Sequence, residues 1–100
     1  MDNCFVVTGV ICRQPDWSES PAGIQHHYLV LEHRSMQQEA GVNRASYFRI
    51  HVVVAGELTR QSHNLMQGDV VRVAGFLNRH QTRSGQAKLV LHAQQIEKLS

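Results

Sequence analysis

Five apolar runs divide the chain, and each is rich in β-branched or aromatic residues. Short clusters of Gly, Pro, Asn and Ser separate them, which is typical of strands joined by turns. We expect strands at residues 4–13, 26–33, 46–54, 69–77 and 87–96. The segment Ala55–Met66, between the third and fourth strands, is the one candidate for a helical turn or short helix.

This order of elements predicts an all-β OB-fold, a five-stranded Greek-key barrel that binds oligonucleotides or oligosaccharides on one face. Gly9 and Gly75 lie inside the first and fourth strands, where they suit the bends of a small barrel. The length of 100 residues predicts a single domain over 1–100. An SH3-like barrel or a plain meander also fits the pattern.

The third strand has two different faces, because side chains alternate sides along a strand. One face is apolar throughout: Phe48, Ile50, Val52 and Val54. The other carries Tyr47, Arg49 and His51 in a row, followed by Val53. An ordinary solvated face explains this row, but we favour a platform that stacks bases and contacts phosphates.

The first strand is apolar on both faces, so one of them needs a cover. Cys4, Val6, Val10 and Cys12 face one way, and Phe5, Val7 and Ile11 face the other. The chain's own helix or termini would provide a cover, as would a second subunit. We predict a homodimer interface at Phe5, Val7 and Ile11.

Charge is unevenly distributed along the chain. The net charge of +2 does not by itself suggest nucleic acid, but no acidic residue occurs from Val70 to Ile96. In an OB-fold the loop within this segment lies beside the binding face. It carries Arg79, Arg83 and Lys88. We predict that these cations contact phosphates, against the alternative of a solvated hairpin with incidental charges.

Two other loops add candidates for the DNA-binding site. Arg13 lies at the start of the first loop, and Trp17 within it could stack on a base, although two acids in the same loop oppose phosphate contacts. Arg34 and Arg44 flank the expected second loop and would extend the cationic path.

The sequence offers no pattern for catalysis or for metal binding. It contains no nucleophile motif, no phosphate-binding glycine loop and no paired carboxylates, so we expect no enzyme, no catalytic residue and no cofactor. The seven histidines lack the spacing of a structural zinc site. We therefore expect no metal ligand.

The two cysteines and the N-terminus bear on the compartment. On one extended strand Cys4 and Cys12 would lie about 26 Å apart, too far for a disulfide. Free buried thiols fit a reducing compartment. The start shows no signal peptide, and no apolar run is long enough to cross a membrane. We expect a cytoplasmic protein with no membrane partner.

Several runs resemble the primosomal replication protein N family, bacterial single-OB proteins of replication restart. These runs are "VVTGVICRQP", "SPAGI", "LEHRS", "QEAG", "RVAGFL" and "LVLHAQQIE", and together they cover essentially the whole chain. The run "GDVVRVAGFL" is shared with single-stranded DNA-binding proteins in general. "LEHRS" followed by "QEAG" separates this family from them.

The resemblance implies a homodimer that binds single-stranded DNA and has no catalytic activity. It also implies two partners in the restart primosome, the restart helicase (primosomal protein N′) and the helicase-loading protein DnaT. Family members carry DNA-contacting basic or aromatic residues at the positions of Arg34, Arg44, Tyr47, Arg83 and Lys88.

The chain departs from the family pattern at three positions. The family often has Trp where this chain has Tyr47, and a basic residue where it has Gln81; Ser18 lies where the first loop is usually more basic. These departures predict a modest affinity for DNA. The alternative function is an OB-fold protein-interaction module with little DNA binding, in which the basic loop docks on an acidic partner.

Overall fold

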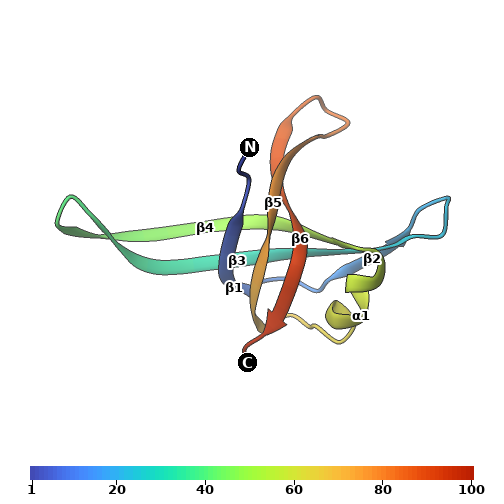
Figure 1. Ribbon diagram of the computed structural model, residues 1–100, viewed down its shortest axis with the longest axis horizontal. Coiled ribbons are helices and arrows are strands. Elements are labelled where there is room, and N and C mark those ends of the chain that lie inside the picture. Colours follow the sequence, from blue (N-terminus) through green and yellow to red (C-terminus); the bar gives the residue numbers. More distant parts are fainter.

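The computed structural model describes all residues from Met1 to Ser100. It contains six strands, a 3-10 turn (η1) and one short helix (Figure 1). In chain order these are β1 (Phe5–Ile11), β2 (Asp16–Glu19), β3 (Gln25–Glu39), β4 (Val42–Ala55), η1 (Gly56–Leu58), α1 (Thr59–Ser62), β5 (Val70–Gln81) and β6 (Ala87–Lys98).

The strands form one sheet that closes on itself. Their order is β1-β5-β6-β4-β3-β2, and an additional pairing between β1 and β3 completes a barrel of the five longer strands. All pairings are antiparallel except that of β4 with β6. This closed topology, with a short helix between β4 and β5, confirms the predicted OB-fold.

The barrel core is aliphatic. It consists of ten buried residues: Ile11, Leu29, Leu31, Val52, Val54, Leu65, Val71, Val73, Leu91 and Ile96. Val52 and Val54 come from the apolar face predicted for β4, and Ile50 of the same face is partly buried against the core. Phe48 is exposed and stacks on His33 at 4.8 Å, because this part of β4 has already left the barrel. The apolar face of β4 is therefore only partly a core face.

The faces of β1 are the reverse of those we predicted. Ile11 is fully buried in the core and Val7 packs against the core, so neither is free to meet a second subunit. Phe5 is exposed at the open start of the strand. Val6 and Val10 point outward instead. The prediction of an outward face at Val7 and Ile11 was wrong, since two apolar faces on one strand look alike in the sequence.

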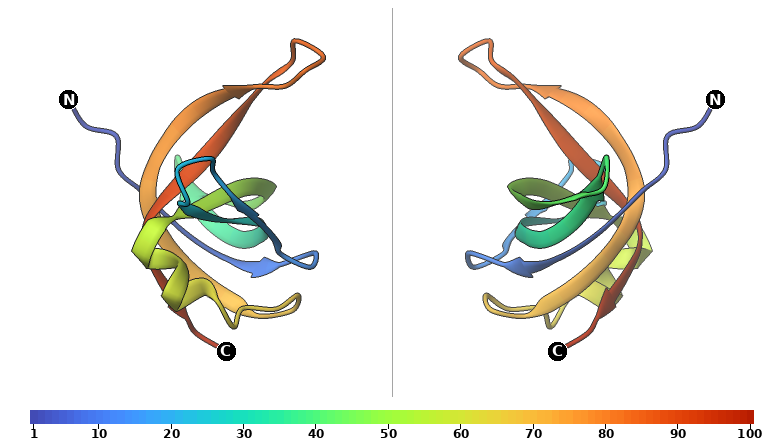
Figure 2. Two further views of the ribbon diagram at one scale, coloured as in Figure 1. Left: turned by 90° about the vertical axis from the view of Figure 1, so that its right-hand side faces the viewer. Right: turned by 90° about the vertical axis from the view of Figure 1, so that its left-hand side faces the viewer.

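Two hairpins project from the barrel. In the first, β3 and β4 stay paired as far as Glu39 and Val42, so the expected loop at 33–44 is mostly a two-stranded ribbon. Its turn places Ala40 and Gly41 at φ 52° and 77°. The second hairpin is β5–β6, which rises away from the barrel on the side opposite the C-terminus (Figure 2).

A short edge strand was not predicted. β2 pairs with the start of β3, with Trp17 opposite His27 and Asp16 opposite Tyr28. The turn after β2 is held by Ser20, whose hydroxyl accepts a hydrogen bond from the Ile24 amide at 3.1 Å. The expected first loop is therefore partly a strand at the edge of the sheet.

The predicted position of the helical segment is confirmed. η1 and α1 both lie inside Ala55–Met66. A Cβ at Gly75 would collide with the backbone carbonyl of His92, at a register shift between β5 and β6. Only glycine fits this close approach. No helix of the structure is both long and apolar enough to cross a membrane.

Candidate nucleic-acid interface

Side chains that point away from the core gather on one surface of β3, β4, β6 and β5. We call this surface the outer face. The alternation along β3 and β4 places Glu32 and Arg34 opposite Arg49 and Tyr47 in the register of the two strands. The outer face comprises Arg13, Tyr28, Glu32, Arg34, Tyr47, Arg49, His51, His80 and Lys88.

One half of the outer face is organised around Glu32. The Nε atoms of Arg34 and Arg49 each donate to its carboxylate at 3.2 Å, and the Tyr47 hydroxyl donates to it at the same distance. These hydrogen bonds, that from Arg34 first, hold the pKa of Glu32 below its usual value, against a smaller opposing effect of desolvation. Glu32 is therefore ionised at neutral pH and fixes three candidate DNA-binding side chains in one place.

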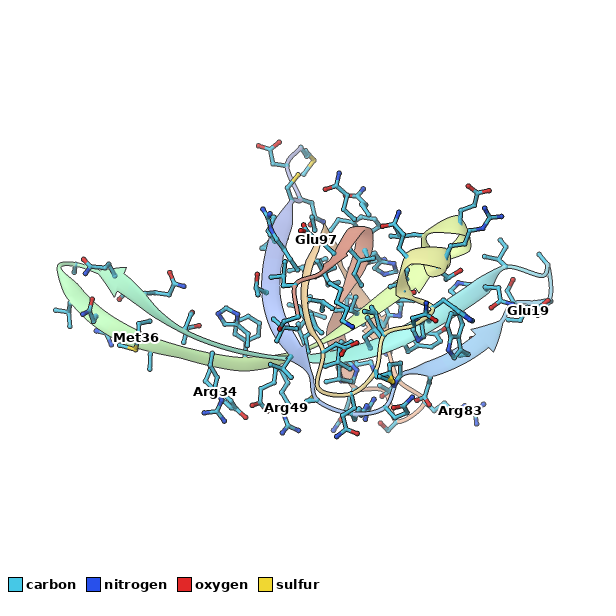
Figure 3. All side chains as sticks on the ribbon, turned by 90° about the horizontal axis from the view of Figure 1, so that it is seen from below. Glu19, Arg34, Met36, Arg49, Arg83 and Glu97 are labelled. Carbon is cyan, nitrogen blue, oxygen red and sulfur yellow. The ribbon has the colours of Figure 1, made fainter.

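Tyr47 offers the largest aromatic surface in this half. Its residue exposure is 53%, and the Arg34 guanidinium lies over its ring at 4.3 Å from the centroid. Arg34 and Arg49 point to the same side of the molecule as Arg83 of the β5–β6 hairpin (Figure 3, lower edge). An exposed ring with two guanidinium groups close by suits a stacked base whose neighbouring phosphates meet the arginines.

The other half of the outer face is a small cleft of about 80 Å³. Arg13, Tyr28, His51, His80 and Lys88 line it. Burial, followed by the nearby charges of Lys88 and Arg13, lowers the pKa of His51. At neutral pH its imidazole is therefore uncharged, and the two cations carry the charge of the cleft.

A pair of histidines adjoins this cleft. The Nε2 atoms of His80 and His92 lie 2.9 Å apart, and His92 stacks on Phe76 at 4.9 Å. The pKa of His92 is lowered by burial and then by His80. Because one nitrogen must donate and the other accept, the pair holds a single proton between these two atoms.

Three of the predicted DNA-binding residues lie apart from the outer face. Arg79 is paired with Leu89, on the face opposite His80 and Lys88. Arg44 is on the side of the ribbon opposite Tyr47, where it pairs with Glu39 at 3.4 Å. Each is an odd number of residues away from an outer-face residue of the same strand. Because side chains alternate sides along a strand, each therefore points to the opposite face.

Trp17 is the third residue that lies apart. It stacks on His27 at 3.8 Å and meets the edge of His63 at 5.5 Å. His27 is fully buried, whereas its neighbour Tyr28 belongs to the outer face, so Trp17 is on the opposite side of the sheet. The remaining candidate, Arg83, lies in the turn of the β5–β6 hairpin.

Sequence reasoning missed four residues of this surface and its surroundings: Tyr28, Glu32, His80 and His92. Tyr28 was detectable, because it has the same parity as Glu32 in the run "HHYLVLEH" and as Arg34, which follows that run. The contacts of Glu32 and of the histidine pair depend on which residues face each other across strands. That register is not visible in the sequence.

The cysteines are not paired, and the potential metal ligands are not clustered. Cys4 and Cys12 are both free; Cys4 is exposed, contrary to the expectation that both are buried, and Cys12 is half-buried. The structure brings no three His, Cys, Asp or Glu side chains together in a group that would hold a metal ion.

The family follows from sequence comparisons. A family model described as "another single-strand binding protein family" matches residues 3–95. The replication restart protein PriB of Photorhabdus laumondii is 47% identical over 96 residues, covering 95% of this chain and 91% of the relative. That of Klebsiella pneumoniae is 42% identical over 98 residues, covering 97% and 94%. The chain belongs to the PriB family of replication restart proteins. This confirms the resemblance drawn from its motifs.

Solved structures support the fold. PriB from Ralstonia solanacearum matches with a TM-score of 0.82 at 22% identity, over the full length of both chains. The single-stranded DNA-binding protein from Thermus aquaticus matches with a TM-score of 0.80 at 21% identity, covering 98% of this chain and 50% of that one. At these identities the likeness shows the OB-fold and nothing finer.

Proposed function

We propose that this protein binds single-stranded DNA on its outer face, without catalysis, and acts in assembly of the replication-restart primosome. The observation that carries the proposal is the convergence of Tyr47, Arg34 and Arg49 on one exposed surface, which continues into the cleft with Arg13 and Lys88. Family membership and the names of the relatives support the same function.

The DNA strand runs across β3, β4 and β6. A base stacks on Tyr47, and neighbouring phosphates meet Arg34 and Arg49. Further along, phosphates meet Lys88 and Arg13 beside the ring of Tyr28. Aromatic rings stack on any base, so this surface predicts little sequence preference.

Glu32 has two opposing effects in this account. It orients Tyr47 through the phenolic hydroxyl and holds both guanidinium groups in place. Its charge also repels phosphate and partly neutralises the two arginines. We expect it to limit DNA affinity, in the same direction as the replacement of a family tryptophan by Tyr47.

The test is a salt series of fluorescence anisotropy titrations with labelled oligo-dT. Each phosphate that the protein neutralises contributes a slope of about −0.7 to the logarithm of affinity against the logarithm of salt concentration. With contacts in both halves of the outer face, we expect a slope of about −1.4 or steeper. Absence of binding at about 50 mM salt would contradict the proposal.

A homodimer is part of the proposal, with Val6 and Val10 in place of Val7 and Ile11. Burying these two exposed side chains of β1 against a second copy removes apolar surface from water. Val6→Asp should produce a monomer in sedimentation equilibrium. Val42→Asp is the matched control, because Val42 is equally exposed at 57% but lies in the β3–β4 ribbon. Monomerisation by both variants, or by neither, would contradict the assignment.

A protein-interaction module is the second candidate function, and the ion pairs of Glu32 favour it, since they occupy two of the arginines. In that case the basic β5–β6 hairpin docks on an acidic partner; we propose the restart helicase and DnaT as the partners. Arg83→Glu with Lys88→Glu should then abolish partner capture and leave oligo-dT binding unchanged. Loss of oligo-dT binding favours the DNA-binding function instead.

A further inference from the structure

A second surface lies on the other side of the β2–β3 edge, beside η1 and α1. It is an open groove of about 600 Å³, compared with about 410 Å³ for the hollow between β5, β6 and α1. It is lined by Trp17, Ile24, Glu57, Arg60 and His63, together with Gly23, Gln25, Gly56 and Thr59. No residue of the outer face lines this groove.

Trp17 is held rigidly in the groove. One face of the indole stacks on His27 at 3.8 Å with an interplanar angle of 14°, and His63 meets the ring edge-on. His27 is itself fixed, because its Nδ1 lies 2.8 Å from the hydroxyl of Ser62, which donates to the carbonyl of Thr59. Trp17 nevertheless remains 42% exposed. A rigid, half-exposed indole is typical of an anchor for a binding partner, since little side-chain entropy is lost on docking.

The charge around this indole is negative. No Lys or Arg occurs from residue 14 to residue 33. Glu19 lies on the same face of β2 as Trp17, and its carboxylate approaches Gly23 at the rim of the groove. Neither Glu19 nor Glu57 has a cation within 4.0 Å. Glu57 and Arg60 of the lining cancel, so the carboxylate of Glu19 at the rim leaves the groove with a charge of −1.

We propose that this groove docks a basic peptide segment of a protein partner. An Arg or Lys side chain of the peptide lies over the exposed face of Trp17, where the ring attracts a cation. Its charged head points toward Glu19 and Glu57, and an apolar side chain of the peptide covers Ile24. The same carboxylates repel phosphates, so this groove would not bind the DNA that the outer face binds.

Trp17 is the chain's only tryptophan, so its emission reports on the groove alone. The probe is acetyl-Arg-Leu-Arg-Leu-Arg-amide, titrated to about 1 mM, the range of weak docking. We expect a saturable change of emission that the charge-reversed peptide acetyl-Glu-Leu-Glu-Leu-Glu-amide does not produce. Absence of a change, or equal changes with both peptides, would overturn the proposal.

Variants make the test specific to the groove. Glu19→Gln and Glu57→Gln should each weaken peptide binding roughly two- to fivefold, as expected for exposed charge pairs, and Arg60→Gln should strengthen it. The matched control is Glu97→Gln, because Glu97 is an exposed acid of β6 that forms no ion pair and does not line the groove. Equal weakening by Glu97→Gln would show that the peptide responds only to net charge and would overturn the proposal.

A second copy of the chain is the competing occupant of the groove. Dilution of the protein without peptide distinguishes it, because self-docking makes Trp17 emission depend on protein concentration. We expect emission per molecule to be constant on dilution. A shift on dilution that parallels dissociation of the protein would overturn the proposal in favour of a contact between copies.

Discussion

The outer face and the Trp17 groove share strand β3 but have opposite charge. Tyr28 points to the outer face, while its neighbour His27 supports Trp17 on the other side. The outer face draws on the acid-free segment Val70–Ile96, and the groove on a stretch without Lys or Arg. Because successive residues of a strand face opposite ways, one strand can serve two surfaces of different chemistry.

The comparison also shows how aromatic residues acquire different roles from their surroundings. Tyr47 lies beneath the Arg34 guanidinium and shares the Glu32 carboxylate with Arg49, whereas Trp17 lies near two unpaired carboxylates. Both rings are about half exposed. Charge, and not exposure, therefore decides which ring suits a base beside phosphates and which suits a cationic side chain.

The largest expected effect is that of Tyr47→Ala on oligo-dT binding. Loss of one stacking contact costs about 1–3 kcal/mol, so affinity should fall roughly 5- to 150-fold in anisotropy titrations. The control is Phe48→Leu, which changes an exposed aromatic on the opposite face of the same strand. If Phe48→Leu weakens binding as much as Tyr47→Ala, the outer face is wrongly assigned.

Substitution of two neighbouring cations of the β5–β6 hairpin should affect DNA binding differently. Lys88→Gln removes a cation of the outer face, so affinity should fall roughly two- to fivefold and the salt slope should become shallower by about 0.7. Arg79→Gln removes a cation from the opposite face and should leave both quantities near their wild-type values. Equal slopes for the two variants would indicate a general charge effect.

Glu32→Gln should increase the affinity for DNA, whereas Tyr47→Ala and Lys88→Gln should lower it. Glutamine keeps an acceptor for the Tyr47 hydroxyl but removes the negative charge that neutralises Arg34 and Arg49. Affinity for oligo-dT should increase about twofold, with a steeper dependence on salt. A decrease would show that the positioning effect of Glu32 outweighs its repulsion of phosphate.

Acidification should slightly increase the affinity of the outer face for DNA. His51 and His92 have pKa values lowered from 6.5 in the free protein, and a phosphate nearby favours their charged forms. DNA binding should therefore take up protons, and affinity should rise as the pH falls below about 6.5. Titrations of wild type and His51→Gln at several pH values test this; the variant should show the weaker dependence, and equal dependence would exclude His51.

The same acidification should destabilise the side of the sheet beneath Trp17. Burial, and then the charge of His63, lowers the pKa of His27 below 6.5. The unfolded chain thus binds more protons, so the stability from neutral His27 is complete above about pH 6.5 and is lost as the pH falls through the folded-state pKa. The melting temperature should drop over this range. His27→Gln should flatten that dependence; His26→Gln, a change at the neighbouring half-buried histidine, should not.

Much of the barrel could be predicted from the sequence because its strands have clear local signals. Period-two alternation placed Tyr47, Arg49 and His51 on one face, and the order of strands indicated the OB-fold. The β3–β4 ribbon escaped detection because its outer half buries no apolar face. Its polar residues, among them Gln38 and Asn43, which hydrogen-bond at 2.7 Å, look like a loop in the sequence.

The rest depended on pairing that local sequence does not determine. The outward side of β1 was ambiguous because Val6 and Ile11 are equally apolar, and only closure of the barrel buries one of them. Trp17 was assigned to DNA because β2 was not recognised as a strand. Once β2 pairs with β3, the register forces Trp17 onto the side of His27.

The separation of the two surfaces can be tested in one titration. Labelled oligo-dT is added to the protein at low salt while dye anisotropy and Trp17 emission are recorded together. We expect anisotropy to rise to saturation while Trp17 emission stays constant, because DNA on the outer face does not reach the groove. Quenching of Trp17 in proportion to bound DNA would contradict the account.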